Sequence, residues 1–471
     1  MEKIRQTLRD SATARWAALF IVSFTMLCGY FLTDIMAPLK GLLEGQLSWN
    51  STEYGIFTSA YGWFNVFLFM LIFGGIILDK MGVRFTGLGA TIIMVLGTAI
   101  KFWAVSTNTL DGQTWNVLWL FEVKAQVFMA GLGYAIFGVG VEVAGITVSK
   151  IIVKWFKGKE LALAMGLEMA MARIGTGLAI VASVPIARSF GIVSVSKPIL
   201  VALIGLCIGL IAFIVYIFMD KKLDESQAAY DLENEIIDEE ESFQIKDIFA
   251  IITNKAWWYI AILCVLFYSS VFPFLKYATD LMVNKFAVRE SLAGLIPGIL
   301  PFGTILLTPF FGNLYDRKGK GASIMILGAV LLIFVHSMFS IPFLNHWLIA
   351  IVLSIVLGIA FSLVPSAMWP SVPKIIPEKR LGTAFSLIFW VQNWGLMGVP
   401  ALIGWVLDKY CVTGQKVVEG VTVSTYNYTI PMMIFTSFGV LALVFGFLLK
   451  AEDKKKGYGL QLPNIEAKIE G

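Results

Sequence analysis

Two charged residues lie deep within long apolar stretches of the sequence, where a charge is costly. Glu142 lies in the stretch 126–152 and Arg173 lies in the next one, 161–187. A charged side chain at the centre of a bilayer costs at least about 3 kcal/mol unless it is paired or hydrated, so such residues commonly mark a functional site. A carboxylate and a guanidinium across one cavity could bind both ends of a small zwitterion. The alternative is a structural or gating ion pair between the two side chains.

Polar and aromatic side chains in other apolar stretches extend this candidate site. They are Tyr30, Tyr268, Gln392, Asn393 and Trp394. For Trp394 the alternative is helix packing or anchoring at the membrane interface. Lys276 is a further candidate, but Asp280 follows it by four residues. These two side chains could equally form an ion pair along one helix, with the lysine reaching toward the interface.

The composition of the whole chain is that of an integral membrane protein. Of the 471 residues, 58% are apolar and only 14% are charged, and the mean hydropathy is +0.80. Soluble domains are about 45–50% apolar and about a quarter charged, which excludes a soluble enzyme, a nucleic-acid-binding protein and a secreted disulfide-rich protein. The four cysteines and two histidines are scattered, and the sequence contains no catalytic-triad or phosphate-binding motif. We therefore expect no metal, no cofactor and no enzymatic activity.

Twelve apolar stretches are long enough to cross the hydrocarbon core of a bilayer, which takes about 20 residues. They predict an all-α membrane protein with twelve transmembrane helices in two six-helix, pseudo-symmetric halves. The predicted spans are 14–36, 52–78, 86–107, 126–152, 161–187 and 196–219 in the first half, and 255–281, 291–314, 321–343, 347–372, 381–407 and 429–449 in the second. The segment around Trp115 and Trp119 is expected to lie at the membrane interface instead.

Charge divides the chain into parts and orients it. Eleven acidic residues and three lysines lie between Asp220 and Ala250, a composition that predicts a solvated linker. The predicted parts are an N-terminal half at 1–219, an acidic cytoplasmic linker at 220–254, a C-terminal half at 255–450 and a cytoplasmic tail at 451–471. Of the 36 Lys and Arg residues, 25 fall on the side of the two termini. Loops rich in Lys and Arg face the cytoplasm, so we expect both termini there.

Two loops share one pattern: a glycine, three residues, an aspartate, a basic residue, one further residue and a second glycine. The matching positions, 237 residues apart, are Gly75, Asp79 and Gly82 in the first loop and Gly312, Asp316 and Gly319 in the second. An aspartate can cap a neighbouring helix and pair with the base, while glycine permits a tight turn. The residues that we expect to act in gating rather than in substrate binding are Asp79, Arg84, Asp316 and Arg317.

A second internal echo, offset by 220 residues, pairs Arg173 with Asn393. If Arg173 faces the cavity, pseudo-symmetry places Asn393 there too, with an amide suited to a peptide bond. The repeated loops, the two six-span halves and the charged central linker together resemble the major facilitator superfamily. That resemblance implies an alternating-access carrier whose halves rock about a central site.

Several shorter motifs are similar to one branch of that superfamily, the lysosomal dipeptide uniporters. The motifs are Trp155–Leu161 (WFKGKEL), Met171–Gly175 (MARIG), Phe272–Phe274 (FPF), Met368–Pro370 (MWP), Leu381–Phe385 (LGTAF) and Gln392–Asn393. The resemblance extends from about Tyr30 to Asp408. It implies transport of dipeptides by uniport, with Glu142 binding the peptide amino terminus and Arg173 its carboxylate. An extended dipeptide separates these two groups by up to roughly 7 Å.

Two other functions remain open at this stage. One is a carrier of another carboxylate-bearing metabolite, possibly coupled to protons; the other is a membrane scaffold or receptor that transports nothing. The expected partners are a dipeptide and the lipid bilayer, without nucleic acid and without an obligate protein partner. The N-terminal segment MEKIRQTLRDSATARW contains no acidic dileucine sorting signal. We therefore expect the bacterial cytoplasmic (inner) membrane rather than the lysosomal membrane.

Overall fold

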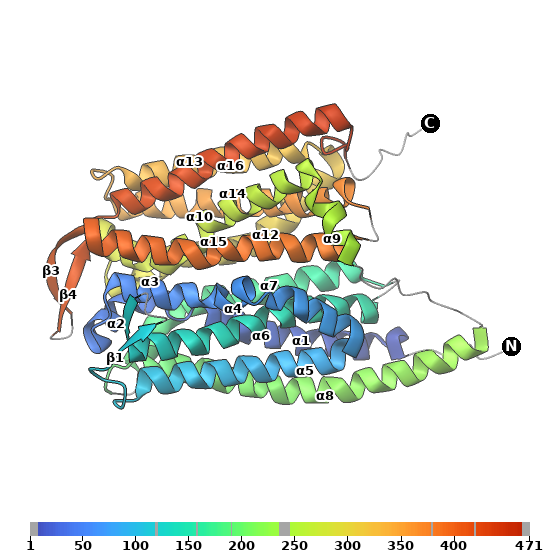
Figure 1. Cartoon of the computed structure of the whole chain (residues 1–471), viewed down its shortest axis with the longest axis horizontal. Coiled ribbons are helices and arrows are strands. Elements are labelled where there is room, and N and C mark those ends of the chain that lie inside the picture. The colour runs from blue at the N-terminus through green and yellow to red at the C-terminus, as the bar shows by residue number, and fades with distance from the viewer. Residues whose placement is uncertain are drawn as a thin grey trace.

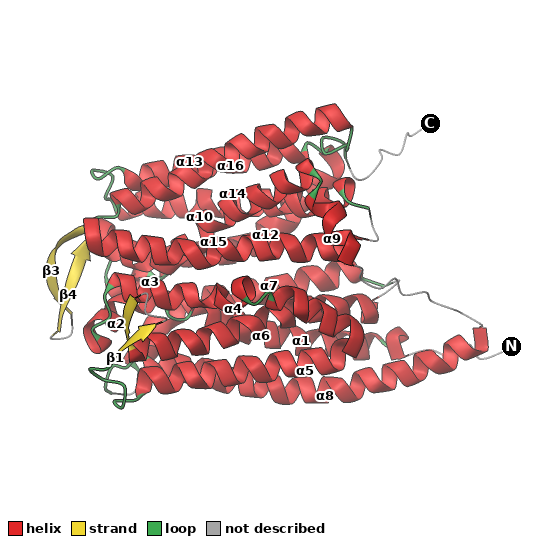
Figure 2. Cartoon of the chain, viewed as in Figure 1, coloured by secondary structure: helices red, strands yellow, loops and turns green. Residues whose placement is uncertain are grey.

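The computed structural model of the chain describes residues 8–117, 121–156, 159–189, 191–234, 245–377, 380–418 and 421–463. Trp119, residues 157–158 of the Trp155–Leu161 motif, residues 235–244 of the predicted linker and residues 464–471 of the predicted tail lie outside this part. The described chain is almost entirely helical, with two short antiparallel hairpins (Figure 2).

The N-terminal half contains the first six spans. Its elements are η1 (Leu8–Asp10), α1 (Ala12–Asp34), η2 (Ala37–Leu39), α2 (Lys40–Leu47), α3 (Ser51–Ser59), η3 (Ala60–Gly62), α4 (Trp63–Phe67), α5 (Met70–Ser106), β1 (Thr114–Val117), β2 (Phe121–Lys124), α6 (Ala125–Phe156), α7 (Leu161–Arg188) and α8 (Ser196–Asn234).

The C-terminal half contains the other six spans. Its elements are α9 (Ile245–Ile252), α10 (Lys255–Phe286), α11 (Glu290–Ala293), α12 (Leu295–Lys318), α13 (Gly321–Ser340), α14 (Trp347–Ile375), α15 (Leu381–Tyr410), β3 (Val412–Val418), β4 (Val421–Tyr426) and α16 (Thr429–Lys456). Figure 1 shows the two halves one above the other, with helices of both running along the same long axis.

The predicted fold is confirmed, although the second span is not one continuous helix. Within the described residues, eleven helices are long and apolar enough to cross a membrane. The second span is instead assembled from α3, η3, α4 and the beginning of α5, interrupted where Phe69 adopts a left-handed conformation (φ 53°). Helix α5 then continues through a kink at Gly82 (φ 76°) into the third span. Gly319, which matches Gly82 in the repeated loop, also has a positive φ of 67°, as a tight turn requires.

Part of the segment predicted as a linker is helical. Helix α8 continues past residue 219 as far as Asn234, and α9 begins at Ile245. Asp220, the first residue of the predicted linker, is fully buried and accepts hydrogen bonds from Trp155 and Tyr216. A buried carboxylate with partners of this kind packs within the helical bundle, so the bundle continues past residue 219.

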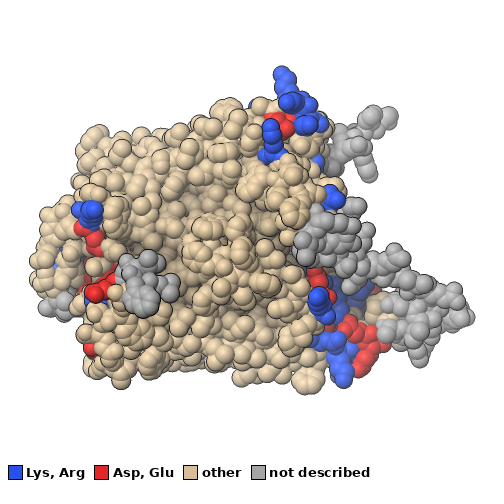
Figure 3. Space-filling model, in the orientation of Figure 1, with Lys and Arg blue, Asp and Glu red and all other residues tan. Residues whose placement is uncertain are grey.

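The two ends of the molecule differ, and we name them by what they carry. The hairpin end holds β1–β2 and β3–β4, whereas the terminal end is the opposite one, where α1 begins and α16 ends (Figures 1 and 2). The sequence predicted an interfacial segment where β1–β2 forms, and it contained no sign of β3–β4. On the face shown in Figure 3, charged side chains gather at the two ends and leave a broad uncharged band between them. A band of this kind is what the hydrocarbon core of a bilayer requires.

The halves approach each other most closely at the hairpin end, where backbone meets backbone. A Cβ atom built on Gly404 of α15 would lie 2.2 Å from the carbonyl oxygen of Ser51 in α3. One built on Gly294, at the start of α12, would lie 2.2 Å from the carbonyl oxygen of Ile180 in α7. Neither position has room for a side chain, because backbone on the facing half cannot rotate away.

This contact yields a first prediction. Gly404→Ala should lower the melting temperature of the purified protein, corresponding to a loss of about 1–3 kcal/mol, because the added methyl group forces α15 away from α3. The matched control is Gly398→Ala on the same helix, where an added Cβ meets nothing within 4 Å. Equal melting temperatures for the two variants, measured by thermal denaturation, would contradict the close contact.

Candidate functional site

A central cavity lies between the two halves and encloses about 590 Å³, including space open to solvent. That volume is within the range of about 300–1,000 Å³ that is usual for small-molecule sites. The lining residues of the N-terminal half are Tyr30, Thr33, Asp34, Thr58, Tyr61, Tyr134 and Glu142, and those of the C-terminal half are Phe272, Pro273, Lys276, Gln392, Leu396 and Pro400. Four residues predicted from the sequence, Tyr30, Glu142, Lys276 and Gln392, are therefore brought together here.

Glu142 of α6 is held at this cavity by neutral hydrogen-bond donors from both halves. The hydroxyl of Tyr61 donates to Oε1 of Glu142 over 2.7 Å. The side-chain amide of Asn393, in α15 of the other half, also hydrogen-bonds to the carboxylate. Neither partner carries a charge, so the negative charge of Glu142 remains available to a cationic group.

Asn393 retains an unused hydrogen-bonding atom beside this carboxylate. It is fully buried, and its Nδ2 also donates to the carbonyl oxygen of Phe389 over 3.0 Å. Its Oδ1 has no hydrogen-bond partner among the described residues. A buried amide oxygen without a partner is unusual and can accept a hydrogen bond from a ligand.

Arg173 of α7 lies against aromatic rings, and Glu168 of the same helix lies within electrostatic range of it without forming an ion pair. Its guanidinium carbon is 5.0 Å from the centre of the Phe361 ring and 5.7 Å from that of Phe272. Such cation–π contacts stabilise the charge without using the N–H donors in the plane of the guanidinium. Arg173 makes no ion pair or hydrogen bond in the described part of the chain, so its donors are free.

The ion pair considered for Glu142 and Arg173 is therefore not formed in this structure. Arg173 is not itself among the residues that line the cavity, but Phe272, one of its two aromatic contacts, is. Tyr30, another lining residue, lies within electrostatic range of both Arg173 and Glu142. The two charges thus flank the same region without neutralising each other.

The remaining aromatic candidates lie at different places. Tyr268 is buried one layer away from the cavity, stacked on Phe272 with 5.4 Å between ring centres, and it accepts a hydrogen bond from the indole of Trp369. Trp394 is 44% exposed on α15 and packs edge-on against Phe67 at 5.9 Å. The structure therefore does not bring Trp394 to the cavity, and helix packing accounts for its position.

Tyr61 is the main cavity residue that the sequence did not single out. It lies in η3, at an interruption of the second span, so its orientation could not be read from helical periodicity. The available signal was a hydroxyl-bearing aromatic side chain near the middle of the predicted span 52–78.

Lys276 pairs with a residue of the other half rather than with its own helix. Its Nζ lies 2.7 Å from Oδ1 of Asp34 in α1, and it also donates to the carbonyl oxygen of Thr33 over 2.6 Å. Asp280, the partner proposed from the four-residue spacing, instead lies 3.3 Å from Nζ of Lys40. The same-helix ion pair is therefore wrong, because each of these residues finds an opposite charge across the boundary between the halves.

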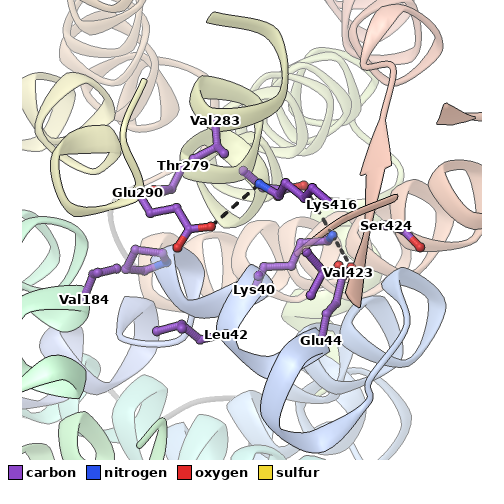
Figure 4. A pocket seen from close by; sticks show the side chains of 13 residues that line it. Lys40, Leu42, Glu44, Val184, Thr279, Val283, Glu290, Lys416, Val423 and Ser424 are labelled. Atoms are coloured by element: carbon purple, nitrogen blue, oxygen red, sulfur yellow. Dashed lines mark hydrogen bonds and ion pairs between the residues drawn. The ribbon is translucent and has the colours of Figure 1, made fainter. Parts of the chain in front are cut away.

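A charged cluster near α2 and the β3–β4 hairpin continues these contacts at the hairpin end (Figure 4). Lys40 lies 2.6 Å from Glu44 and 4.2 Å from the centre of the Tyr426 ring. Glu290 of the C-terminal half accepts from Arg188 of the N-terminal half over 2.8 Å and lies 3.7 Å from Lys416. Ion pairs thus tie the two halves together at this end.

The carboxylate of Asp408, at the end of α15, strengthens the same closure. It accepts hydrogen bonds from the backbone N–H groups of Ser51 and Thr52, at the beginning of α3. The N-terminus of a helix carries a partial positive charge, so a carboxylate there is stabilising. Together with the ion pairs, this contact closes the cavity toward the hairpin end.

At the terminal end, the ion pairs of Asp79 and Arg84 join groups of one half. Asp79 pairs with Lys150 over 2.9 Å, and Arg84 lies 3.7 Å from Asp220 and 3.0 Å from Asp224. These contacts link the predicted gating residues Asp79 and Arg84 to neighbouring helices of the N-terminal half. Asp316 and Arg317 occupy the equivalent position at the end of α12.

Comparison with known proteins agrees with this architecture. The sequence matches the Major Facilitator Superfamily over residues 19–400 and, in a second match, over 277–464. It is 28% identical over 405 residues to the lysosomal dipeptide transporter MFSD1 of Mus musculus and 27% identical over 405 residues to that of Bos taurus. Each of these matches covers 84% of this chain and 80% of the relative.

Solved structures share the fold at much lower sequence identity. A bacterial homologue of the human lysosomal transporter Spinster, in an inward-facing and unoccupied conformation, superposes with a TM-score of 0.67 at 12% identity, covering 98% of this chain and 100% of that one. A D-xylose–proton symporter superposes with a TM-score of 0.65 at 13% identity, covering 92% and 97%. The nucleoside transporter NupG gives 0.62 at 15% identity, covering 93% and 99%.

The family match covers most of the chain, and the helices, the halves and the central cavity are arranged as that match requires. The chain is therefore a multi-pass membrane transporter and not an enzyme, and it belongs to the Major Facilitator Superfamily.

Proposed function

We propose that this transporter carries dipeptides across the bilayer by alternating access, as a uniporter. The observation that carries the proposal is the pair of opposite charges, Glu142 and Arg173, which flank one region and have no charged partner within hydrogen-bond distance among the described residues. The relatives that match over most of the chain are named as dipeptide transporters, which supports the same class of substrate.

In this proposal the charged side chains of Glu142 and Arg173 bind the two ends of the peptide. Glu142 receives the peptide ammonium, while Arg173 binds the carboxylate with two parallel N–H donors. The free Oδ1 of Asn393 lies beside Glu142 and accepts a hydrogen bond from the peptide N–H. None of these contacts involves a peptide side chain, so the site is suited to many dipeptides rather than to one.

The alternative is a carrier of another carboxylate-bearing metabolite, with Arg173 as its anchor and with or without proton coupling. The free donors of Arg173 favour it as much as they favour a dipeptide. Structural neighbours of this chain include transporters of nucleosides and of D-xylose, so the fold does not restrict the substrate. Glu142 distinguishes the two functions, because a simple carboxylic acid has no ammonium group that could pair with the carboxylate of Glu142.

A second prediction tests the role of Arg173. Dipeptide counterflow into proteoliposomes should fall at least about tenfold in Arg173→Ala, because losing a buried charged partner costs several kcal/mol of binding, and Arg173→Lys should recover only part of it. The matched control is Arg289→Ala, which removes an exposed arginine at the hairpin end. If purified Arg173→Ala retains its melting temperature and its full flux, the proposal fails.

A third prediction separates the two candidate substrates. N-acetylation of a competing dipeptide should weaken its inhibition of transport about as much as amidation of its carboxylate, because each change removes one of the two charged contacts. In Glu142→Gln, acetylation should make little further difference. Single organic acids that compete as well as dipeptides do would point instead to the alternative carrier.

We further propose that the terminal end faces the cytoplasm, in the bacterial inner membrane. The halves at 1–219 and 255–450 then rock against each other, with the acidic linker at 220–254 and the tail at 451–471 on the cytoplasmic side. In that orientation the present conformation is closed to the outside, and Asp79, Arg84, Asp316 and Arg317 act at the inner gate.

A fourth prediction checks this orientation. In a variant without the four native cysteines, Thr413→Cys in β3 should react with a membrane-impermeant maleimide added to intact cells, whereas Lys454→Cys in α16 should react only after the cells are permeabilised. Both positions are exposed, so accessibility within the protein does not distinguish them. The reverse labelling pattern would invert the proposed orientation.

A further inference from the structure

A second buried lysine lies close to the ion pair that joins the halves at the hairpin end. Lys101 of α5 is 1% exposed, and its Nζ has no hydrogen-bond partner among the described residues. Nζ lies 4.4 Å from the centre of the Tyr134 ring and 5.1 Å from that of Phe57. These two rings are themselves stacked, with centres 5.2 Å apart. Lys101 plays no part in the substrate binding proposed above.

This lysine is in an unfavourable position in the present conformation. A buried ammonium group without an acceptor is destabilising, and cation–π contacts offset only part of that penalty. The charged groups within electrostatic range of Lys101 are Lys276, which repels it, and Asp34, which attracts it. One carboxylate, Asp34, therefore lies near two ammonium groups and pairs directly with only one of them, Lys276.

The two lysines belong to different halves. Asp34, Lys101 and Tyr134 lie in the N-terminal half, on α1, α5 and α6, whereas Lys276 lies on α10 of the C-terminal half. Separation of the halves at the hairpin end removes Lys276 from Asp34 and leaves Lys101 in place. Asp34 is only 3% exposed, so it then needs a new partner.

We propose that Lys101 is the alternate partner of Asp34. The carboxylate pairs with Lys276 while the hairpin end is closed and with Lys101 when that end opens. Tyr134 is the side chain between them, because its hydroxyl lies 3.4 Å from Nζ of Lys276 while its ring face lies on Lys101. This inference rests on the alternating access proposed above, but not on the identity of the substrate.

The exchange explains why an unpaired lysine is buried at this place. In the closed state Asp34 is paired and Lys101 is not; in the open state Asp34 is paired again and Lys276 faces the widening gap, where water can solvate it. Neither state leaves the carboxylate buried alone. Lys101 therefore brings the two states closer in free energy, so that the ion pair with Lys276 closes the gate without locking it.

The test measures opening of the hairpin end directly, in the absence of any substrate. Thr279→Cys, introduced into a variant without the four native cysteines, lies one turn beyond Lys276 toward the hairpin end and is 3% exposed, so a maleimide reaches it only when that end opens. Lys101→Met should slow this labelling about tenfold, because Asp34 loses its partner in the open state. The matched control is Lys285→Met, also at the hairpin end of α10, whose ammonium contacts carbonyl groups of its own half, those of Phe339 and Ile341.

A second comparison shows whether the effect passes through Asp34. Asp34→Asn should speed the labelling, and adding Lys101→Met to it should produce no further slowing. Equal slowing in both backgrounds, or a labelling rate for Lys101→Met within about twofold of that for Lys285→Met, would overturn the proposal. Because the substitution removes an unpaired buried charge, Lys101→Met should also raise the melting temperature, and a variant that fails to fold would contradict the proposal as well.

Discussion

A buried charge is costly unless it finds a partner, and at the hairpin end three ion pairs take their two partners from opposite halves. Lys276 binds Asp34, Lys40 binds Asp280 and Arg188 binds Glu290, each pair joining one half to the other. Carboxylates and ammonium groups separated in a medium of low polarity are unstable, so these pairs hold the halves together more strongly than their exposed equivalents could. The closed hairpin end, and with it the shape of the central cavity, depends on this constraint.

Glu142 and Arg173, the two charges of the proposed site, are accommodated in a different way. Glu142 is satisfied by a hydroxyl and an amide, and Arg173 by the faces of two aromatic rings. Both arrangements make a buried charge tolerable while leaving its net charge uncancelled. A site built in this way attracts an oppositely charged ligand group. If the two charges of the site already formed an ion pair, that pair would have to break before a ligand could bind.

Most of the fold and part of the candidate site could be predicted from the sequence. The patterns that indicate them either extend over a whole helix or lie within a few neighbouring residues. Twelve apolar stretches and a twofold loop motif define the fold, and a lone acid in the fourth span marks the position of Glu142. Partner choice could not be predicted in the same way. The four-residue spacing of Lys276 and Asp280 suggests a pair along one helix, yet the opposite half supplies nearer charges to both. Tyr61 was missed because its span is broken at η3, and periodicity carries no information across a break.

The length of helix α8 has a consequence for the environment of the cavity. Its 39 residues make a rod of about 58 Å, roughly twice the thickness of a bilayer hydrocarbon core. Figure 1 shows it projecting well past the other helices at the terminal end. Ion pairs from Arg84 and Lys154 to Asp220 and Asp224 brace the rod where it leaves the bundle. The chain that leaves the N-terminal half is thereby carried beyond the bundle on a stiff, braced helix, which holds its last described residue far from the first turn of α1 and from the cavity.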